Sequence, residues 1–189
     1  MRLRIIDHAH APKQASRSEG GDTLRGVDVL FCHGLESAPH GAKYHALVDA
    51  GLEVIAPDCR EKDLAQRVAL LSAAILEHQP RVVVGSSYGG IAGLLASLVA
   101  LEQGQTIEGL LMCAPALALP DPEGLEVVRR CPAPTVIIHA PADDVCPFAA
   151  SEAFAQAHGA RLIAVEDDHR LSGSMGVIVS EAKALQQDR

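Results

Sequence analysis

The chain has 189 residues, a formal net charge of −8 and 48% hydrophobic residues, which suits one folded domain whose core needs no disulfide or metal. The acidic balance, 3% aromatic content and absence of Trp argue against nucleic acid or an anionic membrane as a partner. The longest apolar run, 91–101, is well short of the roughly 20 residues that a membrane span needs. No apolar stretch follows Arg2 and Arg4, and the five cysteines show no CxxC spacing. We therefore expect a soluble cytoplasmic protein with reduced cysteines.

Short apolar runs alternate along the chain with longer segments of helical spacing. Strands are expected at 27–32, 52–56, 81–85, 107–113, 134–139 and 161–165, and helices at 44–50, 64–77, 91–101, 149–157 and 175–186. The strands lack polar alternation, which is typical of a parallel sheet covered on both faces. The predicted fold class is therefore α/β: a three-layer sandwich with a mostly parallel sheet of six or seven strands and helices on both faces.

The chain is expected to form a single domain over residues 1–189. Residues 2–6 are a candidate outer strand, and the polar, Gly-rich residues 11–25 are interpreted as a surface loop or mobile segment. The stretch between Ala114 and the strand at 134 is too short for a separate cap domain. His8 and His10 have the HxH spacing of metal-dependent hydrolases, but no further ligands are placed, so no metal is expected and this segment is interpreted as solvated.

The strongest chemical signal is Gly85-Ser86-Ser87-Tyr88-Gly89, a GxSxG pattern between an expected strand and an expected buried helix. In a nucleophile elbow, this turn holds the central serine in a strained conformation with its hydroxyl above the sheet edge. The flanking glycines are needed because the crowded backbone leaves no room for a Cβ atom. A passive serine in a Gly-rich turn is the alternative, but the patterns of phosphate-binding loops are missing. The sequence therefore predicts that Ser87 is a nucleophile.

A serine nucleophile needs a base that is oriented by an acid, and this fold supplies them in the chain order Ser, Asp/Glu, His. Asp143 follows the strand expected at 134–139 and is the preferred acid, with Asp144 as its competitor. His169 follows the last expected strand and is the predicted base. His158 precedes that strand and is interpreted as a helix-end residue.

The anion formed on attack needs backbone N–H donors that already point at it. We expect them from Tyr88, at the start of the elbow helix, and Leu35, in the loop after the first core strand. His33 is expected to brace that loop. Glu36, Ser37 and Leu117 are expected to border the substrate. The stretch at 116–119 would form an apolar pocket wall or pack onto the core, and the sequence does not decide between these two.

These residues carry a resemblance to a known family. Over about 27–186 the chain resembles the α/β-hydrolase superfamily, and within it the small YqiA-like bacterial esterases. The matching pieces are His33-Gly34, Ser37-Ala38-Pro39 with Lys43, the elbow at 85–90, His139 with Asp143, Val145 and Pro147, and Asp168-His169. The resemblance implies hydrolysis of esters or thioesters through an acyl-enzyme, without a cofactor.

The predicted function is accordingly a serine esterase or thioesterase acting on small to medium acyl groups, with Ser87, His169 and Asp143 as the catalytic residues. Two alternatives stay open at this point. One is a binding module that has the hydrolase fold but no catalysis, and the other is an acyltransferase in which an alcohol or amine replaces water. The sequence does not predict the oligomeric state or the natural substrate.

Overall fold

The computed structural model describes residues 26–118 and 131–186. The expected strand at 2–6, the segment at 11–25 and the histidines at 8 and 10 lie outside the described residues, as does position 119.

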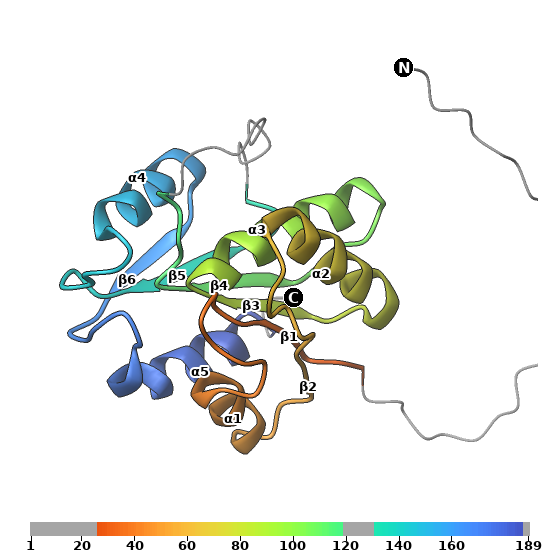
Figure 1. The fold of residues 1–189 in the computed structure, drawn as a ribbon, viewed down its shortest axis with the longest axis horizontal. Coiled ribbons are helices and arrows are strands. Elements are labelled where there is room, and N and C mark those ends of the chain that lie inside the picture. The colour runs from red at the N-terminus through yellow and green to blue at the C-terminus, as the bar shows by residue number, and fades with distance from the viewer. Residues whose placement is uncertain (1–25, 119–130, 187–189) are drawn as a thin grey trace, which may run out of the picture.

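Within these described residues, six strands form one parallel sheet in the order β2-β1-β3-β4-β5-β6 (Figure 1). The strands are β1 (Val29–Cys32), β2 (Val54–Ile55), β3 (Val82–Ser86), β4 (Gly109–Cys113), β5 (Thr135–His139) and β6 (Arg161–Ala164). The helices are α1 (Ala42–Asp49), α2 (Leu64–His78), α3 (Tyr88–Glu102), α4 (Phe148–His158) and α5 (Met175–Ala184), with a 3-10 turn, η2, at Ser172–Ser174. This arrangement confirms the predicted α/β class with a parallel sheet; six of the six or seven predicted strands lie within the described residues.

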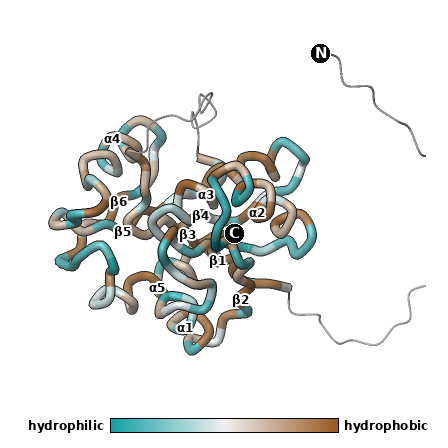
Figure 2. Tube along the Cα trace, in the orientation of Figure 1, coloured by the Kyte–Doolittle hydropathy of each residue, from teal (hydrophilic) through white to brown (hydrophobic). Residues whose placement is uncertain are grey.

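The sheet separates two hydrophobic clusters, and this makes the fold a three-layer sandwich. On one face, side chains such as Leu30 and Met112 pack against α2, α3 and α4. On the other face, Val29 and Val84 pack against α1 and α5. Adjacent residues of a strand point to opposite faces, so an unbroken apolar strand fills both clusters. Figure 2 shows the resulting hydrophobic centre as brown tube along β1, β3, β4 and α3.

Hydrogen bonds and backbone conformation near the ends of α2 and β2 explain where these elements begin and end. A capping box starts α2, in which the Asp63 carboxylate accepts from the Gln66 N–H (2.8 Å) and the Gln66 side chain accepts from the Asp63 N–H (3.1 Å). Gln79 ends the same helix in a left-handed conformation with φ 48°, one residue before Pro80. Strand β2 is shorter than predicted because only its two residues pair with β1, while the Leu52 N–H donates to a carbonyl of α1.

All six strands run in the same direction, so their carboxyl ends lie at one edge of the sheet. Ligands of open α/β sheets bind at this edge. The loops that follow β1, β3, β5 and β6, together with the first residue of α3, contain every residue that the sequence predicts to take part in catalysis. Among the described helices, none is long and apolar enough to cross a membrane.

Candidate active site

Ser87 occupies the sharp turn between β3 and α3, with φ 54° and ψ −120°. A non-glycine residue rarely adopts positive φ, and the surrounding structure must hold it there. Three backbone hydrogen bonds do so: the Ser87 N–H donates to the Cys113 carbonyl (2.9 Å), and the Ser87 carbonyl accepts from Gly90 (2.8 Å) and Ala116 (3.1 Å). The strained serine is thus fixed by the end of β4 and by its own helix.

The glycines of the elbow are required by close backbone contacts. A Cβ atom on Gly85 would collide with the backbone of Gly89 and Gly90, which belong to the first turn of α3. A Cβ atom on Gly89 would collide with the carbonyl groups of Cys32 and His33. These contacts press the elbow against the end of β1, which brings the loop after β1 beside the serine.

The structure brings Ser87, His169 and Asp143 into one hydrogen-bonded chain. His169 Nε2 lies 3.0 Å from Ser87 Oγ, and His169 Nδ1 lies 2.7 Å from Asp143 Oδ2. The Asp143 side chain is fully buried and that of His169 is 19% exposed. Asp144, the competing acid, is exposed and takes no part in this chain.

The surroundings of Asp143 favour its charged form. Burial alone would raise its pKa, but the N–H of Cys146, the His169 ring and the N–H of Val145 all stabilise the carboxylate. Both N–H groups donate to Asp143 Oδ1 at 2.8 Å. The net effect is a pKa of Asp143 below its ordinary value, so the group is ionised at neutral pH and can orient an imidazole.

A second histidine, His139, also contacts the carboxylate of Asp143, a role that the sequence pattern did not predict. Its Nε2 lies 2.9 Å from Asp143 Oδ2 and 3.2 Å from the Cys146 carbonyl, and its Nδ1 lies 2.8 Å from Ser151 Oγ. Because Nε2 faces two acceptors, it carries the proton, and Ser151 donates to Nδ1. The sequence signal was available: a histidine ends the apolar strand β5, four residues before Asp143.

Lys43 holds the loop that carries His169. Its Nζ donates to the Arg170 carbonyl at 2.6 Å, although the two residues are 127 positions apart. The side chain is buried, and burial lowers the pKa of its ammonium group. The resemblance included Lys43 in a motif without giving it a function, and the structure shows this contact with the residue after the histidine.

The two residues expected to supply oxyanion donors border the serine from different elements. Tyr88 follows it directly, and a Cβ atom on Gly34, the neighbour of Leu35, would lie 3.5 Å from the Cβ of Ser87. Within the described chain, neither the Leu35 nor the Tyr88 N–H donates to another protein group. His33 is buried against this loop, where its Nδ1 contacts the Gly34 carbonyl at 2.8 Å.

The remaining predicted residues lie around this centre. Glu36 and Ser37 are exposed in the loop after β1. Leu117 is half-buried and packs against the hydrophobic cluster beneath α3, next to the Ala116 N–H that holds the Ser87 carbonyl. All five cysteines are free. Burial raises the pKa of Cys146, which lies beside Ser87, so this thiol stays protonated and does not compete as a nucleophile.

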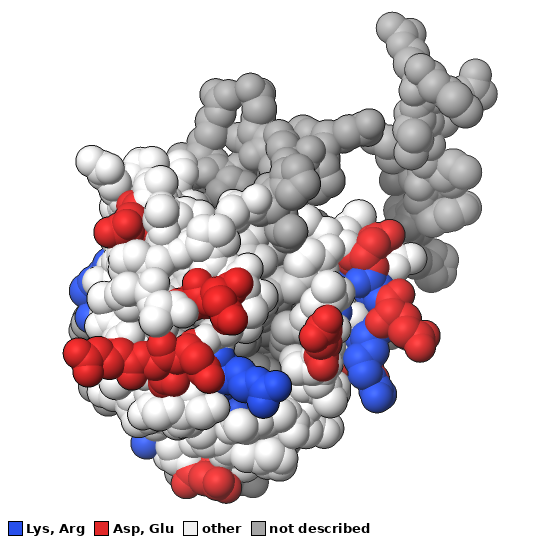
Figure 3. Space-filling model, turned by 60° about the vertical axis from the view of Figure 1, so that its left-hand side comes forward, with Lys and Arg blue, Asp and Glu red and all other residues white. Residues whose placement is uncertain are grey.

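Acidic side chains lie near the candidate site (Figure 3), but the described residues form no metal-binding group. Figure 3 shows patches of acidic side chains on the side of the molecule where α4, β5 and β6 lie, and the run Glu166-Asp167-Asp168 belongs to the loop after β6. Among the described residues, no group of three or more His, Cys, Asp or Glu side chains is arranged to hold a metal ion.

A parallel three-layer sandwich with a serine in a strand–turn–helix elbow defines the α/β hydrolase fold. The sequence model of the Alpha/beta hydrolase family matches residues 29–126, just over half of the chain, and the protein belongs to this family. A search of curated proteins gives no match.

Solved structures agree with this assignment. The chain is similar to a protein of Xanthomonas campestris pv. campestris assigned to the α/β hydrolase superfamily (26% identity, TM-score 0.67, 84% of this chain and 96% of that one). It also shares its fold with Est1E of Butyrivibrio proteoclasticus (17% identity, TM-score 0.66, 88% of each chain). A third similar structure is the monoacylglycerol lipase of Paleococcus ferrophilus (15% identity, TM-score 0.65, 85% of this chain and 96% of that one).

Proposed function

We propose that the protein is a serine hydrolase that cleaves carboxylic esters or thioesters of small to medium acyl groups through an acyl-enzyme on Ser87. The observation that carries the proposal is the continuous chain from Ser87 Oγ through His169 to the buried carboxylate of Asp143. A serine hydroxyl is a weak nucleophile on its own, and this arrangement is the one that activates it.

In the first half-reaction, Ser87 Oγ attacks the acyl carbonyl carbon while His169 Nε2 takes the hydroxyl proton. Asp143 keeps the His169 proton on Nδ1 and stabilises the imidazolium that forms. The carbonyl oxygen becomes an oxyanion, which the N–H groups of Leu35 and Tyr88 stabilise. The tetrahedral intermediate then collapses, His169 returns the proton to the leaving alcohol or thiol, and the acyl group stays on Ser87.

In the second half-reaction, water repeats these steps from the other side. His169 takes a proton from water, the resulting hydroxide attacks the acyl carbon, and the proton returns to Ser87 Oγ as the carboxylic acid leaves. The proposed single domain needs no cofactor for either half, because every proton transfer takes place between His169 and Ser87, the leaving group or water.

The surface around Ser87 supports a neutral acyl substrate. Leu35 and Val145 are two of the large hydrophobic side chains that are exposed, at 58% and 62%, and both belong to loops beside the serine. The acidic run in the loop after β6 and the net charge of −8 disfavour anionic substrates. Among the similar folds, Est1E is also known with ferulic acid bound, and another is a monoacylglycerol lipase, both of which fit an ester-cleaving role.

The experiment that tests the proposal is reaction with a fluorophosphonate probe, followed by peptide mass mapping. We expect one adduct on Ser87 in the wild type and none in Ser87→Ala. Ser86→Ala is the matched control, since it removes the adjacent hydroxyl and should leave the label in place. An unlabelled, folded wild type would overturn the proposal. A labelled protein would then be assayed with p-nitrophenyl esters and acyl thioesters of increasing chain length.

A further inference from the structure

The peptide unit between Gly34 and Leu35 lies in the loop after β1, beside the elbow: a Cβ atom on Gly34 would be 3.5 Å from the Cβ of Ser87. Its C=O belongs to Gly34 and its N–H to Leu35, and in a trans peptide these two groups point in opposite directions. The groups that hold the Gly34 carbonyl therefore determine where the Leu35 N–H points. This matters because the Leu35 N–H is one of the two donors that the proposed function requires.

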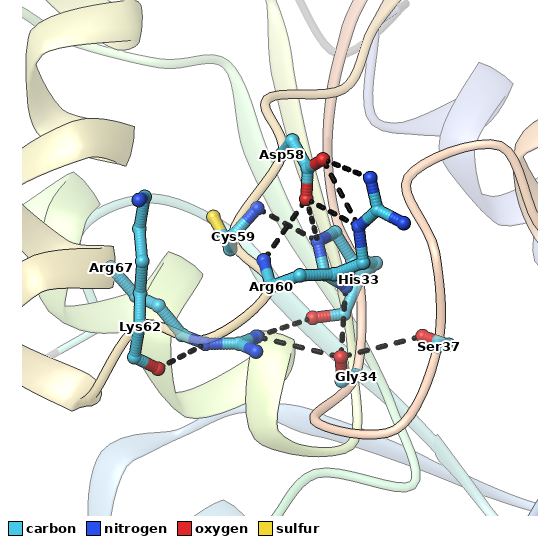
Figure 4. Close-up of polar contacts among 8 residues, drawn as sticks. All are labelled: His33, Gly34, Ser37, Asp58, Cys59, Arg60, Lys62 and Arg67. Atoms are coloured by element: carbon cyan, nitrogen blue, oxygen red, sulfur yellow. Dashed lines mark hydrogen bonds and ion pairs between the residues drawn. The ribbon is translucent and has the colours of Figure 1, made fainter.

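Three side chains hold the Gly34 carbonyl (Figure 4). They are His33, whose Nδ1 donates at 2.8 Å, Ser37, whose Oγ donates at 3.4 Å, and Arg67, whose Nη1 donates at 3.5 Å. The Cys59 N–H donates to His33 Nε2 at 2.9 Å, so the ring proton of neutral His33 lies on Nδ1, where it can donate. Burial lowers the pKa of His33, which keeps this ring neutral.

Arg67 is the unusual member of this group. It is only 1% exposed, and its Nη1 also donates to the His33 carbonyl at 3.0 Å while its Nε donates to the Lys62 carbonyl at 3.1 Å. Its Nη2 is buried without a hydrogen-bond partner, and no described carboxylate forms an ion pair with the guanidinium. Its Cζ lies 5.0 Å from the ring centroid of Tyr88.

A buried cation without a counter-ion destabilises the fold. Arg67 lies in α2, outside the elbow, yet it contacts both segments that supply the proposed oxyanion donors: the His33–Gly34 backbone and Tyr88. A negative charge that forms beside those segments would be stabilised by the guanidinium in a region of low dielectric constant. Donation to a peptide carbonyl also polarises the peptide and strengthens its N–H as a donor.

We infer that Arg67 is a positioning residue for the oxyanion hole: it fixes the peptide between Gly34 and Leu35 and stabilises, from beneath the loop, the negative charge of the transition state. This inference rests on the proposed serine hydrolase function. It assigns the buried charge of Arg67 to the reaction, because carbonyl groups and the Tyr88 ring contact the guanidinium but no described carboxylate pairs with it.

The test compares an oxoester with the thionoester of the same acyl group and alcohol, since a thiocarbonyl sulfur gains less from an oxyanion hole than an oxygen does. Arg67→Met keeps an unbranched apolar stem and removes the guanidinium with its charge. We expect kcat for the oxoester to fall about 10- to 100-fold, less than the ~10²–10³-fold typical of losing a donor outright. KM should change little, and the ratio of oxoester to thionoester rates should fall by a similar factor.

Two further variants make the result specific. Arg67→Lys keeps the charge but loses the fork of donors, so its rate ratio should lie between those of the wild type and Arg67→Met. Arg161→Met removes an exposed arginine that pairs with Glu181 at the far edge of the sheet, and it should leave the ratio unchanged. A merely structural role of Arg67 would lower the melting temperature without changing the ratio.

The outcomes separate the inference from the function on which it rests. If the wild type takes up fluorophosphonate on Ser87 and cleaves esters, but Arg67→Met keeps the wild-type ratio, the inference is wrong and the proposed function stands. If the wild type neither labels nor cleaves esters, both are wrong. Should Arg67→Met fail to fold, an unchanged ratio in Arg67→Lys would overturn the inference instead.

Discussion

Replacing Asp143 by asparagine is expected to abolish catalysis while leaving the fold nearly intact. Each carboxylate oxygen of Asp143 accepts two hydrogen bonds. Oδ1 accepts from the N–H groups of Val145 and Cys146, and Oδ2 accepts from the rings of His139 and His169. The backbone N–H groups cannot become acceptors. In Asp143→Asn, the amide oxygen therefore takes the Oδ1 site, and the amide nitrogen takes the Oδ2 site between the two histidines.

The two histidines respond differently to this amide. His139 can move its proton to Nδ1, donate to Ser151 Oγ and accept from the amide at Nε2, and it then loses only its donation to the Cys146 carbonyl. His169 must also accept at Nδ1, which moves its proton to Nε2, and there it faces Ser87 Oγ as a donor and cannot take the serine proton. We expect kcat to fall by roughly 10³–10⁴-fold, the scale seen when a triad histidine is held in the wrong tautomer.

Stability should change little in the same variant. The loss is the charge-assisted part of these hydrogen bonds, about 1–2 kcal/mol, which corresponds to a Tm lower by about 2–8 °C in a domain of this size. The assay pairs ester hydrolysis with thermal unfolding followed by circular dichroism. Asp144→Asn, an exposed position, is the control and should retain wild-type kcat and Tm. Near-wild-type turnover by Asp143→Asn would refute the tautomer argument.

Three further predictions follow from other contacts. Lys43→Met should lower kcat about tenfold, because it removes the hydrogen bond that holds the loop of His169. Burial lowers the pKa of Lys43, so the folded state binds the ammonium proton less tightly than the unfolded state does. Removing this charge should therefore not lower Tm at pH 7. Gly89→Ala should lose the soluble fold, because its Cβ atom collides with the Cys32 carbonyl, whereas Gly176→Ala, with open space around the new atom, should be as stable as the wild type or slightly more so. The lowered pKa of Asp143 means that its charged form stabilises the fold at neutral pH. The difference in Tm between the wild type and Asp143→Asn should therefore shrink as the pH falls below 3.8, the ordinary pKa of Asp, and through the lower pKa of Asp143 in the folded state.

The fold was largely predictable because its sheet is buried on both faces. Strands such as β3 and β4 are unbroken apolar runs, and α3 is apolar all round, so length and composition alone distinguish them. The edges of elements were less predictable. The length of β2, for example, is set by its pairing with β1, which involves only two of its residues. This pairing joins residues far apart in the chain, so the local sequence pattern does not predict it.

The site was predictable in part, for a similar reason. The elbow pattern and the chain order of acid and base select Ser87, Asp143 and His169, and the parallel sheet brings their loops to one edge. The resemblance included Lys43 and His139, but their roles were missed, because their contacts depend on the tertiary structure. Arg67 left one signal: it lies three residues after Leu64 and four before Leu71, on the apolar side of α2, where a charged side chain must be buried.

The half-exposed edge strand β6 has a consequence for how activity arises and is lost. Ser87 belongs to the centre of the sheet, but its proposed base, His169, comes 82 residues later, in the loop beyond β6. Within the part of the chain that the structure describes, β6 pairs only with β5. Under the proposed function, we expect the serine to stay unreactive during synthesis until β6 has left the ribosome and docked on β5. In the mature protein, local opening of the edge strand would separate base from nucleophile while the core stays folded. On heating, turnover should therefore stop at a lower temperature than the one that melts the central sheet.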